Sequence, residues 1–383
     1  MKKILTFLVF LFLLLNISLA DVFVYEKPDI KIIVEGNALQ LDNEVPVIVN
    51  SRTLVPLRKL LIGLGVPDNT ENIKWIGEKR QVKVVHNNIK IELTIDDLEA
   101  YINGEKYKLD SAPIIYRNRT YLPARFVGEA LGYTISWDQY TPAVLVTSNE
   151  NVKKITQIFD NLGTVMSNTK SYEVFTEEKV KETSNINGKL NTLEYTISAL
   201  EKADIINKTI YTEKTYKSDI ENNINYSYYT PSVFYNCYKY IEDEILYNTG
   251  WNIWDYSGEQ SNVFEDKSKV AIFNVDKDLY GSFLCTEHED SYEISTVSNQ
   301  IDVLKLLGEK RLYEETFSYN SINNLDFRLI IDKVTKLPMS LNLVVDMGYK
   351  EDNKNKISAN KKIEYVAEFV SYNENVELVL PKP

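Results

Sequence analysis

Aromatic side chains gather between residues 226 and 256 at a density that suits contact with a ligand. We expect Tyr228, Tyr235, Trp251 and Trp254 to be the ligand-facing members of this group. Such rings stack on sugars or line an apolar cavity, because Tyr and Trp combine a large apolar body with one hydrogen-bonding group. The same pattern is typical of ordinary strand faces, and the sequence leaves both interpretations open.

Residues that carry catalysis or bind metals are sparse. His86 and His288 are the only histidines, and no Gly-x-Ser-x-Gly, His-Glu-x-x-His or phosphate-loop pattern occurs. The segment from Asn274 begins like a calcium loop, but it has Leu279 and Cys285 where the loop needs Gly and Glu. We therefore predict no catalytic residue, no metal ligand and no cofactor, although paired carboxylates of a hydrolase would leave no signal in sequence spacing.

The only cysteines are Cys237 and Cys285. Outside the cytoplasm they could form a disulfide, and two buried free thiols are the alternative. Glu287 to Asp290, around His288, is interpreted as the tip of a hairpin and not as a metal or base site.

The first twenty residues have the pattern of a secretory signal. Lys2 and Lys3 precede an apolar run from Ile4 to Ile17, and small residues follow up to Ala20. We predict cleavage after Ala20 and a secreted, extracellular or cell-envelope location, with an uncleaved anchor as the alternative. No later apolar run is long enough to cross a membrane. The formal net charge of −12 argues against a nucleic-acid partner.

Two stretches of the front half repeat one another, as copies at about 30–86 and 89–148. Seven residues recur at a constant offset of 67, namely Pro46, Arg52, Thr53, Pro56, Arg58, Leu64 and Gly65 as Pro113, Arg119, Thr120, Pro123, Arg125, Leu131 and Gly132. Trp75 and Trp137 are 62 apart, so the first copy has five additional residues near 66–73.

Each copy is predicted to contain strands around one helix. Glu35-Gly36 and Asn103-Gly104 are hairpin turns between apolar runs. Pro56 begins the first helix, Thr53 caps it and Gly65 ends it in the left-handed conformation. The counterparts in the second copy are Pro123, Thr120 and Gly132.

This pattern resembles the domain named for the N-terminal stalk of copper amine oxidases, which often occurs in tandem in secreted bacterial proteins. The resemblance covers about residues 30–148 and implies a five-stranded antiparallel sheet around a helix. It does not imply amine oxidase activity, which needs three imidazoles on copper and a tyrosine within Asn-Tyr-Asp/Glu. This chain has two histidines, and Asn225-Tyr226 is followed by Ser227.

Arg58 and Arg125 have two interpretations. Their guanidinium groups could form an anion site, or they could fix the helix to a neighbouring turn, for example at Asp138. We favour the structural role. The first copy lacks the glutamate that the family often has in this helix and that Glu129 supplies in the second copy, so Arg58 is expected to have a different partner from Arg125.

The back half is predicted to be one larger β domain. Val152 to Asn168 is an amphipathic helix, alternating strands follow from Ser171 to Tyr372, and Ile301–Leu307 is a short helix. The order resembles LolA/LppX-type lipoprotein domains, in which a curved sheet wraps a cavity plugged by a helix. The supporting segments are residues 166–172, the Trp251–Tyr256 hairpin, residues 331–335 before Pro338, and Leu380-Pro381. The resemblance implies an apolar or lipid ligand.

The fold class is therefore α+β. Two tandem small antiparallel-sheet-plus-helix units occupy residues 21–150, and a larger, mainly antiparallel β domain with one or two helices occupies residues 151–383. The function hypothesis is a non-catalytic secreted or cell-envelope protein. Its stalk module would associate with cell wall or envelope components, and its β domain would bind a ligand or partner. The alternatives are an extracytoplasmic hydrolase with unidentified carboxylates and a purely structural spacer.

The predicted signal has a direct test. Deleting Lys2–Ala20 is expected to abolish export, because the charged and apolar regions that a translocation machinery recognises are removed. Immunoblots of medium, envelope and cytoplasm measure the outcome, with the full chain as control. Unchanged export would contradict the signal assignment.

Overall fold

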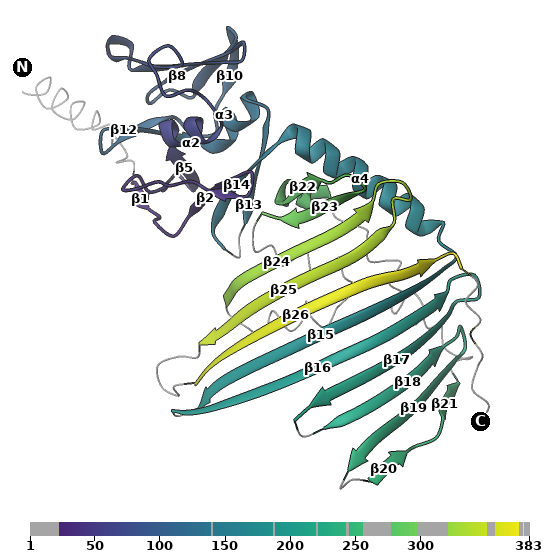
Figure 1. Cartoon of the computed structure of the whole chain (residues 1–383). Coiled ribbons are helices and arrows are strands. Elements are labelled where there is room, and N and C mark those ends of the chain that lie inside the picture. Colours follow the sequence, from purple (N-terminus) through teal and green to yellow (C-terminus); the bar gives the residue numbers. More distant parts are fainter. Residues whose placement is uncertain are drawn as a thin grey trace, which may run out of the picture. The chain divides into compact units, whose positions relative to one another are not determined.

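The computed structural model describes residues 23–138, 141–186, 188–219, 221–242, 245–255, 277–297, 321–350, 357–374 and 378 (Figure 1). The predicted signal, the predicted helix Ile301–Leu307 and Leu380-Pro381 lie outside these residues. The chain packs as two compact units. Unit 1 contains Gln40–Ala130 and the residues up to Asp29, and unit 2 contains Ile30–Leu39 and everything from Leu131 onward. This division differs from the boundary predicted near residue 150.

Unit 1 contains two five-stranded sheets, ordered β1-β4-β5-β12-β11 and β10-β9-β8-β7-β6. The elements are β1 Tyr25–Glu26, β4 Val47–Val49, β5 Arg52–Pro56, α2 Leu57–Gly63, β6 Ile73–Ile76, η1 Gly77–Lys79, β7 Gln81–His86, β8 Ile89–Thr94, β9 Glu99–Ile102, β10 Glu105–Lys108, β11 Ile114–Tyr116, β12 Arg119–Pro123 and α3 Ala124–Ala130.

Equivalent positions of the two sequence copies face one another where β5 pairs with β12. Val55 lies opposite Leu122, its counterpart at the offset of 67, while Leu54 and Pro56 lie opposite Pro123 and Tyr121. Val55 and Leu122 are fully buried. An isolated two-stranded hairpin is at best marginally stable in water, so pairing the two central hairpins gives both a sheet wide enough to persist.

The copies also share a sheet, which the sequence prediction of two tandem sheet-plus-helix units did not include. Asn87 and Asn88, both with positive φ (45° and 66°), join β7 to β8, so that His86 pairs with Ile89. A turn this tight forces the last strand of the first copy onto the first strand of the second. The result is one sheet built from both copies.

The predicted turn and helix signals were largely confirmed. Gly65 and Gly132 follow their helices with φ of +83° and +88°, and the hairpin turn before Glu105 forms at Asn103-Gly104. The predicted capping by Thr53 is wrong. Thr53 lies within β5, which extends to Pro56. Pro56 occupies the N-cap position of α2, and no side chain there accepts a hydrogen bond from the helix N-terminus.

Unit 2 begins with a four-stranded sheet ordered β13-β14-β2-β3. Its strands are β2 Lys31–Val34, β3 Asn37–Ala38, β13 Tyr133–Asp138 and β14 Ala143–Ser148. β14 pairs in parallel with β2, and the Glu35 carboxylate accepts a hydrogen bond from the Ser148 N–H at 2.6 Å. Thr147 donates to the Gly281 carbonyl at 2.7 Å. These contacts explain why Ile30–Leu39 belongs to unit 2.

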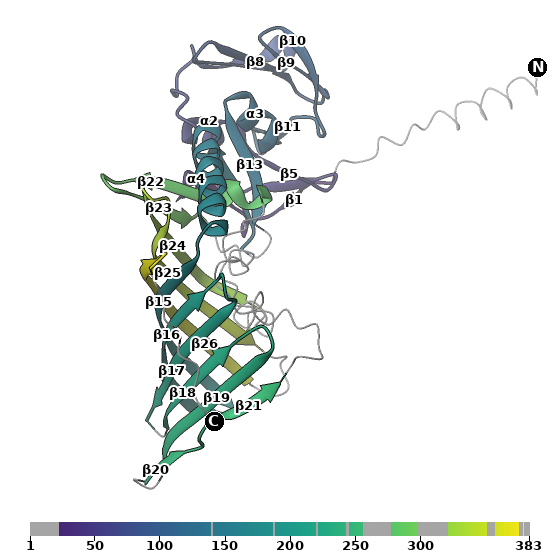
Figure 2. The ribbon, with the colours of Figure 1, turned by 90° about the vertical axis from the view of Figure 1, so that its right-hand side faces the viewer.

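The main part of unit 2 is a twelve-stranded antiparallel sheet preceded by one long helix, and the fold is α+β with a large β part (Figures 1 and 2). Along the sheet the order is β20-β19-β18-β17-β16-β15-β26-β25-β24-β23-β22, and β21 also pairs with β19. The elements are α4 Asn149–Ser167, β15 Ser171–Ile186, β16 Lys189–Asp204, β17 Thr209–Ser218, β18 Asn222–Tyr229, β19 Val233–Glu242, β20 Ile245–Asn248, β21 Asn252–Asp255, η3 Lys277–Ser282, β22 Phe283–Glu287, β23 Ser291–Thr296, β24 Ser321–Asp332, β25 Pro338–Lys350 and β26 Ile357–Tyr372.

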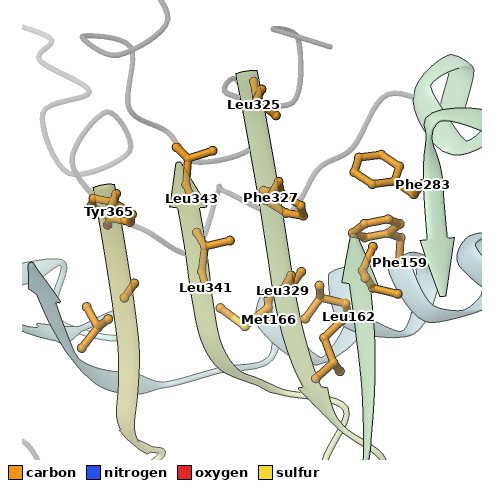
Figure 3. Close-up of a cluster of buried hydrophobic side chains, with 14 of the residues drawn as sticks. Phe159, Leu162, Met166, Phe283, Leu325, Phe327, Leu329, Leu341, Leu343 and Tyr365 are labelled. Carbon is orange, nitrogen blue, oxygen red and sulfur yellow. The ribbon is translucent and has the colours of Figure 1, made fainter. Parts of the chain in front are cut away.

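Helix α4 closely matches the predicted helix at 152–168. Ser148 caps it by accepting a hydrogen bond from the Asn151 N–H at 3.3 Å, and Glu150 complements the helix dipole in the first turn. An apolar stripe packs on one face of the sheet with 0–7% exposure, formed by Ile155, Ile158, Phe159, Leu162 and Met166 (Figure 3). None of the helices in the described ranges is long and apolar enough to cross a membrane.

We predict that truncating this stripe destabilises unit 2. Phe159 stacks on Tyr280 and meets Phe283 edge-on, both at 5.6 Å between ring centroids. Phe159→Ala should therefore lower the free energy of unfolding by about 3–5 kcal/mol. Urea denaturation measures the change. Phe175→Ala on the opposite face of β15, where the ring is partly exposed, is the matched control and should cost under about 1 kcal/mol. Equal losses would contradict the packing.

Candidate functional site

The sheet face that α4 covers changes character across its width. On β22–β26 it is apolar, with side chains such as Phe283, Phe327 and Leu343 fully buried in the same cluster as the α4 stripe (Figure 3). On β16–β19 the residues in the same register become mostly polar. They are Glu201, Thr212, Lys214, Asn225, Ser227 and Asn236. The helix thus uses the apolar part of the face and leaves the polar part for other contacts.

A groove of about 230 Å³ lies on this polar part. Four strands line it, with β16 contributing one residue and β17, β18 and β19 three each. The lining residues are Glu201, Ile210, Thr212, Lys214, Asn225, Ser227, Tyr229, Phe234, Asn236 and Tyr238.

A stack of three aromatic rings forms one wall of the groove. Tyr229 stacks on Phe234 with 4.6 Å between ring centroids and an interplanar angle of 21°. Phe234 stacks on Trp254 of β21 at 5.1 Å and 24°. Trp254 remains 43% exposed and Tyr238, across the groove floor, 45%. Exposed ring surface next to polar side chains is the arrangement that holds ligands with both an apolar face and hydrogen-bonding groups.

The groove floor contains a polar group with unmet hydrogen-bonding capacity. Asn236 is only 4% exposed, and its side-chain amide N–H donates to the Asn225 Oδ1 at 2.8 Å. No partner for the Asn236 Oδ1 exists among the described residues. A buried acceptor without a donor costs about 1–3 kcal/mol, so this oxygen favours a donor brought by another molecule. At the end of the floor, Tyr172 donates to Glu201 at 2.7 Å.

The predicted ligand-facing aromatics divide between the two faces of the sheet. Tyr228 lies opposite Tyr235 in the β18–β19 pairing, and Trp251 meets Tyr228 edge-on at 5.6 Å, so these three share the face away from α4. Only Trp254 lies beside the groove. Tyr228 also packs on Tyr211 at 4.7 Å. Burial raises the pKa of both phenols.

Sequence inspection missed most of the groove. Tyr229 and Phe234 lie in the aromatic segment 226–256 but are not among the four predicted residues, because each adjoins an aromatic residue, Tyr228 or Tyr235, that points the other way. Because side chains alternate along a strand, one member of each pair faces the groove. Which member does so depends on the register of β18 against β17, and the sequence carries no signal for that register.

The cysteine alternatives are decided in favour of free thiols. Cys237 lies on β19 and Cys285 on β22, with eight strands between these two in the sheet order. Cys237 is buried, and its thiol contacts the Asn248 Oδ1 at 3.3 Å. Burial raises the pKa of the Cys285 thiol. The disulfide considered from the sequence is therefore not formed.

Other residues considered for chemistry have structural partners. His288 lies at the tip of the β22–β23 hairpin, as predicted, with its Nε2 3.5 Å from Glu293. Arg58 pairs with Asp68, whereas the Arg125 Nε lies 3.9 Å from Glu129, so the two arginines differ in partner as expected. Over the described part of the chain, no group of three or more His, Cys, Asp or Glu side chains is placed to hold a metal ion.

Comparison with protein families identifies the front of the chain. Residues 33–146 match the copper amine oxidase N-terminal domain. This match confirms the resemblance inferred from the repeated Pro, Arg and Gly positions. The matched residues cover most of both sequence copies, and they lie partly in unit 1 and partly in unit 2. No curated protein matches the chain.

Among solved structures, a DUF1329 family protein from Desulfovibrio piger is 12% identical, with a TM-score of 0.20, and the alignment covers 60% of this chain and 95% of that one. A LolA-superfamily protein from Nitrosomonas europaea is 7% identical, with a TM-score of 0.13, covering 57% and 94%. A putative outer membrane lipoprotein-sorting protein domain from Vibrio parahaemolyticus is 7% identical, with a TM-score of 0.15, covering 60% and 94%. Lipoprotein-sorting and LolA-superfamily domains, the type named from the sequence, are thus among the solved structures that are similar to this chain.

The free thiols give a test of the groove-bearing sheet. Both thiols should be absent from any disulfide and should react slowly in the native protein, because one is buried and the raised pKa of the other disfavours the reactive thiolate. Alkylation without reductant, followed by intact-mass measurement, should add two groups after unfolding and fewer before it. A mass two hydrogens lower, with no alkylation after unfolding, would show a disulfide.

Proposed function

We propose that this protein is a non-catalytic, extracytoplasmic binding protein whose ligand occupies the groove on β16–β19. The observation that carries the proposal is the unpaired Asn236 oxygen on the floor of a groove walled by the Tyr229–Phe234–Trp254 stack. A donor on the ligand would satisfy the oxygen, and a flat apolar surface on the ligand would cover exposed Trp254. The ligand class is therefore an amphipathic molecule with a flat apolar face and hydrogen-bond donors.

An acyl chain suits this groove less well than such a ligand. The apolar part of the sheet face is already buried in one cluster with the α4 side chains Ile155 and Leu162. The open part has six polar side chains along its floor, and burying them under a hydrocarbon chain would leave their hydrogen bonds to water unreplaced. The lipid expected from the LolA resemblance thus becomes an outcome to be tested in the groove.

Binding without catalysis is favoured by the groove's charge content. Glu201 is the only carboxylate among its lining residues, and it already accepts the Tyr172 hydroxyl. Glycoside cleavage uses two carboxylates across the scissile bond. The hydrolase alternative would need a second acid that the lining of this groove does not contain. The sequence has no Gly-x-Ser-x-Gly or His-Glu-x-x-His pattern that would indicate another type of hydrolysis.

The extracytoplasmic location is supported by the signal pattern in residues 1–20 and by the copper amine oxidase N-terminal domain at 33–146. We propose that this domain associates with envelope components while the long sheet binds its ligand. The competing view is a purely structural spacer. It accounts for neither the Asn236 side-chain oxygen that lacks a donor among the described residues nor the exposed face of Trp254.

The proposal is tested by mass spectrometry of the full secreted chain purified from its own producing cells. Native spectra should show an adduct, and denaturation should release one small molecule that contains both ring or fused-ring carbon and hydroxyl or amide groups. Phe234→Ala and Asn236→Ala should each raise the dissociation constant for this molecule about fivefold or more and so lower its occupancy, since each removes an interaction worth about 1 kcal/mol or more.

Tyr235→Ala is the matched control, because Tyr235 is the residue between these two and points to the opposite face. Ligand occupancy in the Tyr235→Ala variant should stay at the wild-type level. A spectrum with no adduct, or an adduct unaffected by both groove variants, would refute the proposal. If the released molecule is a simple fatty acid and its binding is lost in Phe234→Ala, the ligand of the groove is a lipid and not an amphipathic molecule with a flat apolar face.

A further inference from the structure

A second and larger hollow lies entirely within unit 1. It is a cleft of about 690 Å³ between helix α2, strands β6 and β7, and the β11–β12 hairpin. Its size falls within the range of roughly 300–1,000 Å³ that is usual for sites of small organic ligands. Nothing in the groove of unit 2 contributes to it, and the family match assigns it no role.

Three large apolar side chains are exposed around this cleft. Trp75 of β6, Ile62 of α2 and Ile115 of β11 are 46%, 42% and 45% exposed. Single exposed apolar residues are common on protein surfaces. Here three of them come from three separate elements and line one hollow, which is the arrangement expected of a ligand surface. The indole of Trp75 provides the only aromatic ring in the lining.

The charged residues of the cleft are already paired. Arg58 pairs with Asp68, the Arg119 Nε lies 2.9 Å from Glu44, and the Lys59 ammonium lies 2.6 Å from Asp42. Each cation in the lining thus has its own carboxylate. A polyanionic ligand would have to displace these carboxylates, and a lipid chain would bury them without replacing their water. A neutral ligand avoids both costs.

Paired charges still offer hydrogen bonds to such a ligand. A guanidinium has five N–H donors and a carboxylate about four acceptor positions, so the Arg58–Asp68 and Arg119–Glu44 pairs each keep unused donors beside unused acceptors. Neighbouring hydroxyl groups on a sugar ring likewise present donors and acceptors side by side. The apolar face of the ring, which consists of C–H groups, suits the exposed indole.

The cleft is particular to the first sequence copy. Asp68 and Ile73 come from the segment with the five additional residues, and the counterpart of Ile62 at the offset of 67 is Glu129, which pairs with Arg125 instead. The second copy keeps the tryptophan, as Trp137, without this set of neighbours. The repeat therefore supplies a natural control for the role of the indole.

We propose that the unit 1 cleft binds a neutral polysaccharide strand, with Trp75 stacking on a sugar ring and the Arg58–Asp68 and Arg119–Glu44 pairs hydrogen-bonding to its hydroxyl groups. This site is independent of the groove on β16–β19. It gives the copper amine oxidase N-terminal domain a chemical basis for associating with a glycan-containing envelope. Ile62 and Ile115 cover adjacent parts of the bound strand.

The experiment is isothermal titration calorimetry of the full secreted chain with soluble oligomers of N-acetylglucosamine and of glucose. At least one series should bind, more tightly with increasing length until the cleft is filled, and with an affinity that is nearly unchanged between low and high salt. Trp75→Ala should weaken binding about tenfold or more, and Trp75→Phe should restore part of the loss, since a ring face returns.

Asp68→Asn provides a second variant, and its exposed position should leave folding intact, which circular dichroism verifies. It should also weaken binding several-fold by removing a charged acceptor. Trp137→Ala is the matched control, because Trp137 is the repeat counterpart of Trp75 and is similarly exposed, and it should bind as the wild type does. Phe234→Ala should also bind normally, which separates this site from the groove.

Four results would overturn the proposal. The first is that the wild-type chain binds neither series of oligomers. The second is equal loss in Trp75→Ala and Trp137→Ala, which would point to a general effect on folding. The third is binding that disappears at high salt, since this would show a charged polymer recognised by the cations. Preferential binding of an extended proline-rich peptide over both sugars would likewise replace the polysaccharide.

Discussion

The packing of α4 on one end of the long sheet is the interaction on which unit 2 depends. Helix and sheet meet through side chains that are almost completely buried, and each such side chain contributes roughly 1.5–3 kcal/mol when removed from water. The helix can lie there because β14 leads directly into it, with Ser148 ending the strand and capping the helix. The four-stranded sheet and the twelve-stranded sheet are thus joined by one continuous segment.

Asn151 shows how closely this segment controls the edge of the sheet. Its side-chain amide donates to the Phe283 carbonyl at 2.8 Å and accepts from the Cys285 N–H at 2.9 Å. These are the bonds that another strand would make with β22. An unpaired edge invites association with other chains, and a side chain that occupies its hydrogen-bonding groups reduces that hazard. The first turn of α4 therefore both positions the apolar stripe and covers part of the edge.

Much of the fold could be predicted from local signals, because turns and helix ends depend on a few neighbouring residues. Gly65, Gly132 and Asn103-Gly104 fall into this class, and so does α4. The sheet that the two sequence copies share could not be predicted in the same way, since it depends on which partner β7 finds after the turn at Asn87-Asn88. The groove was missed for a related reason. In Tyr228-Tyr229 and Phe234-Tyr235 both residues are aromatic, so period-two alternation alone does not reveal which side faces α4.

The two hollows differ in how their polar groups are prepared for a ligand. In the groove, Asn236 lacks a donor at its buried oxygen, so a ligand that supplies one removes an existing cost and is favoured over any ligand that cannot. In the cleft, the charges near Trp75 are paired and partly exposed, and surface pairs of this kind contribute only about 0–1 kcal/mol. They can therefore exchange partners with hydroxyl groups at little cost. The groove should consequently discriminate sharply between ligands, whereas the cleft should bind more weakly and accept related polymers, as an attachment surface requires.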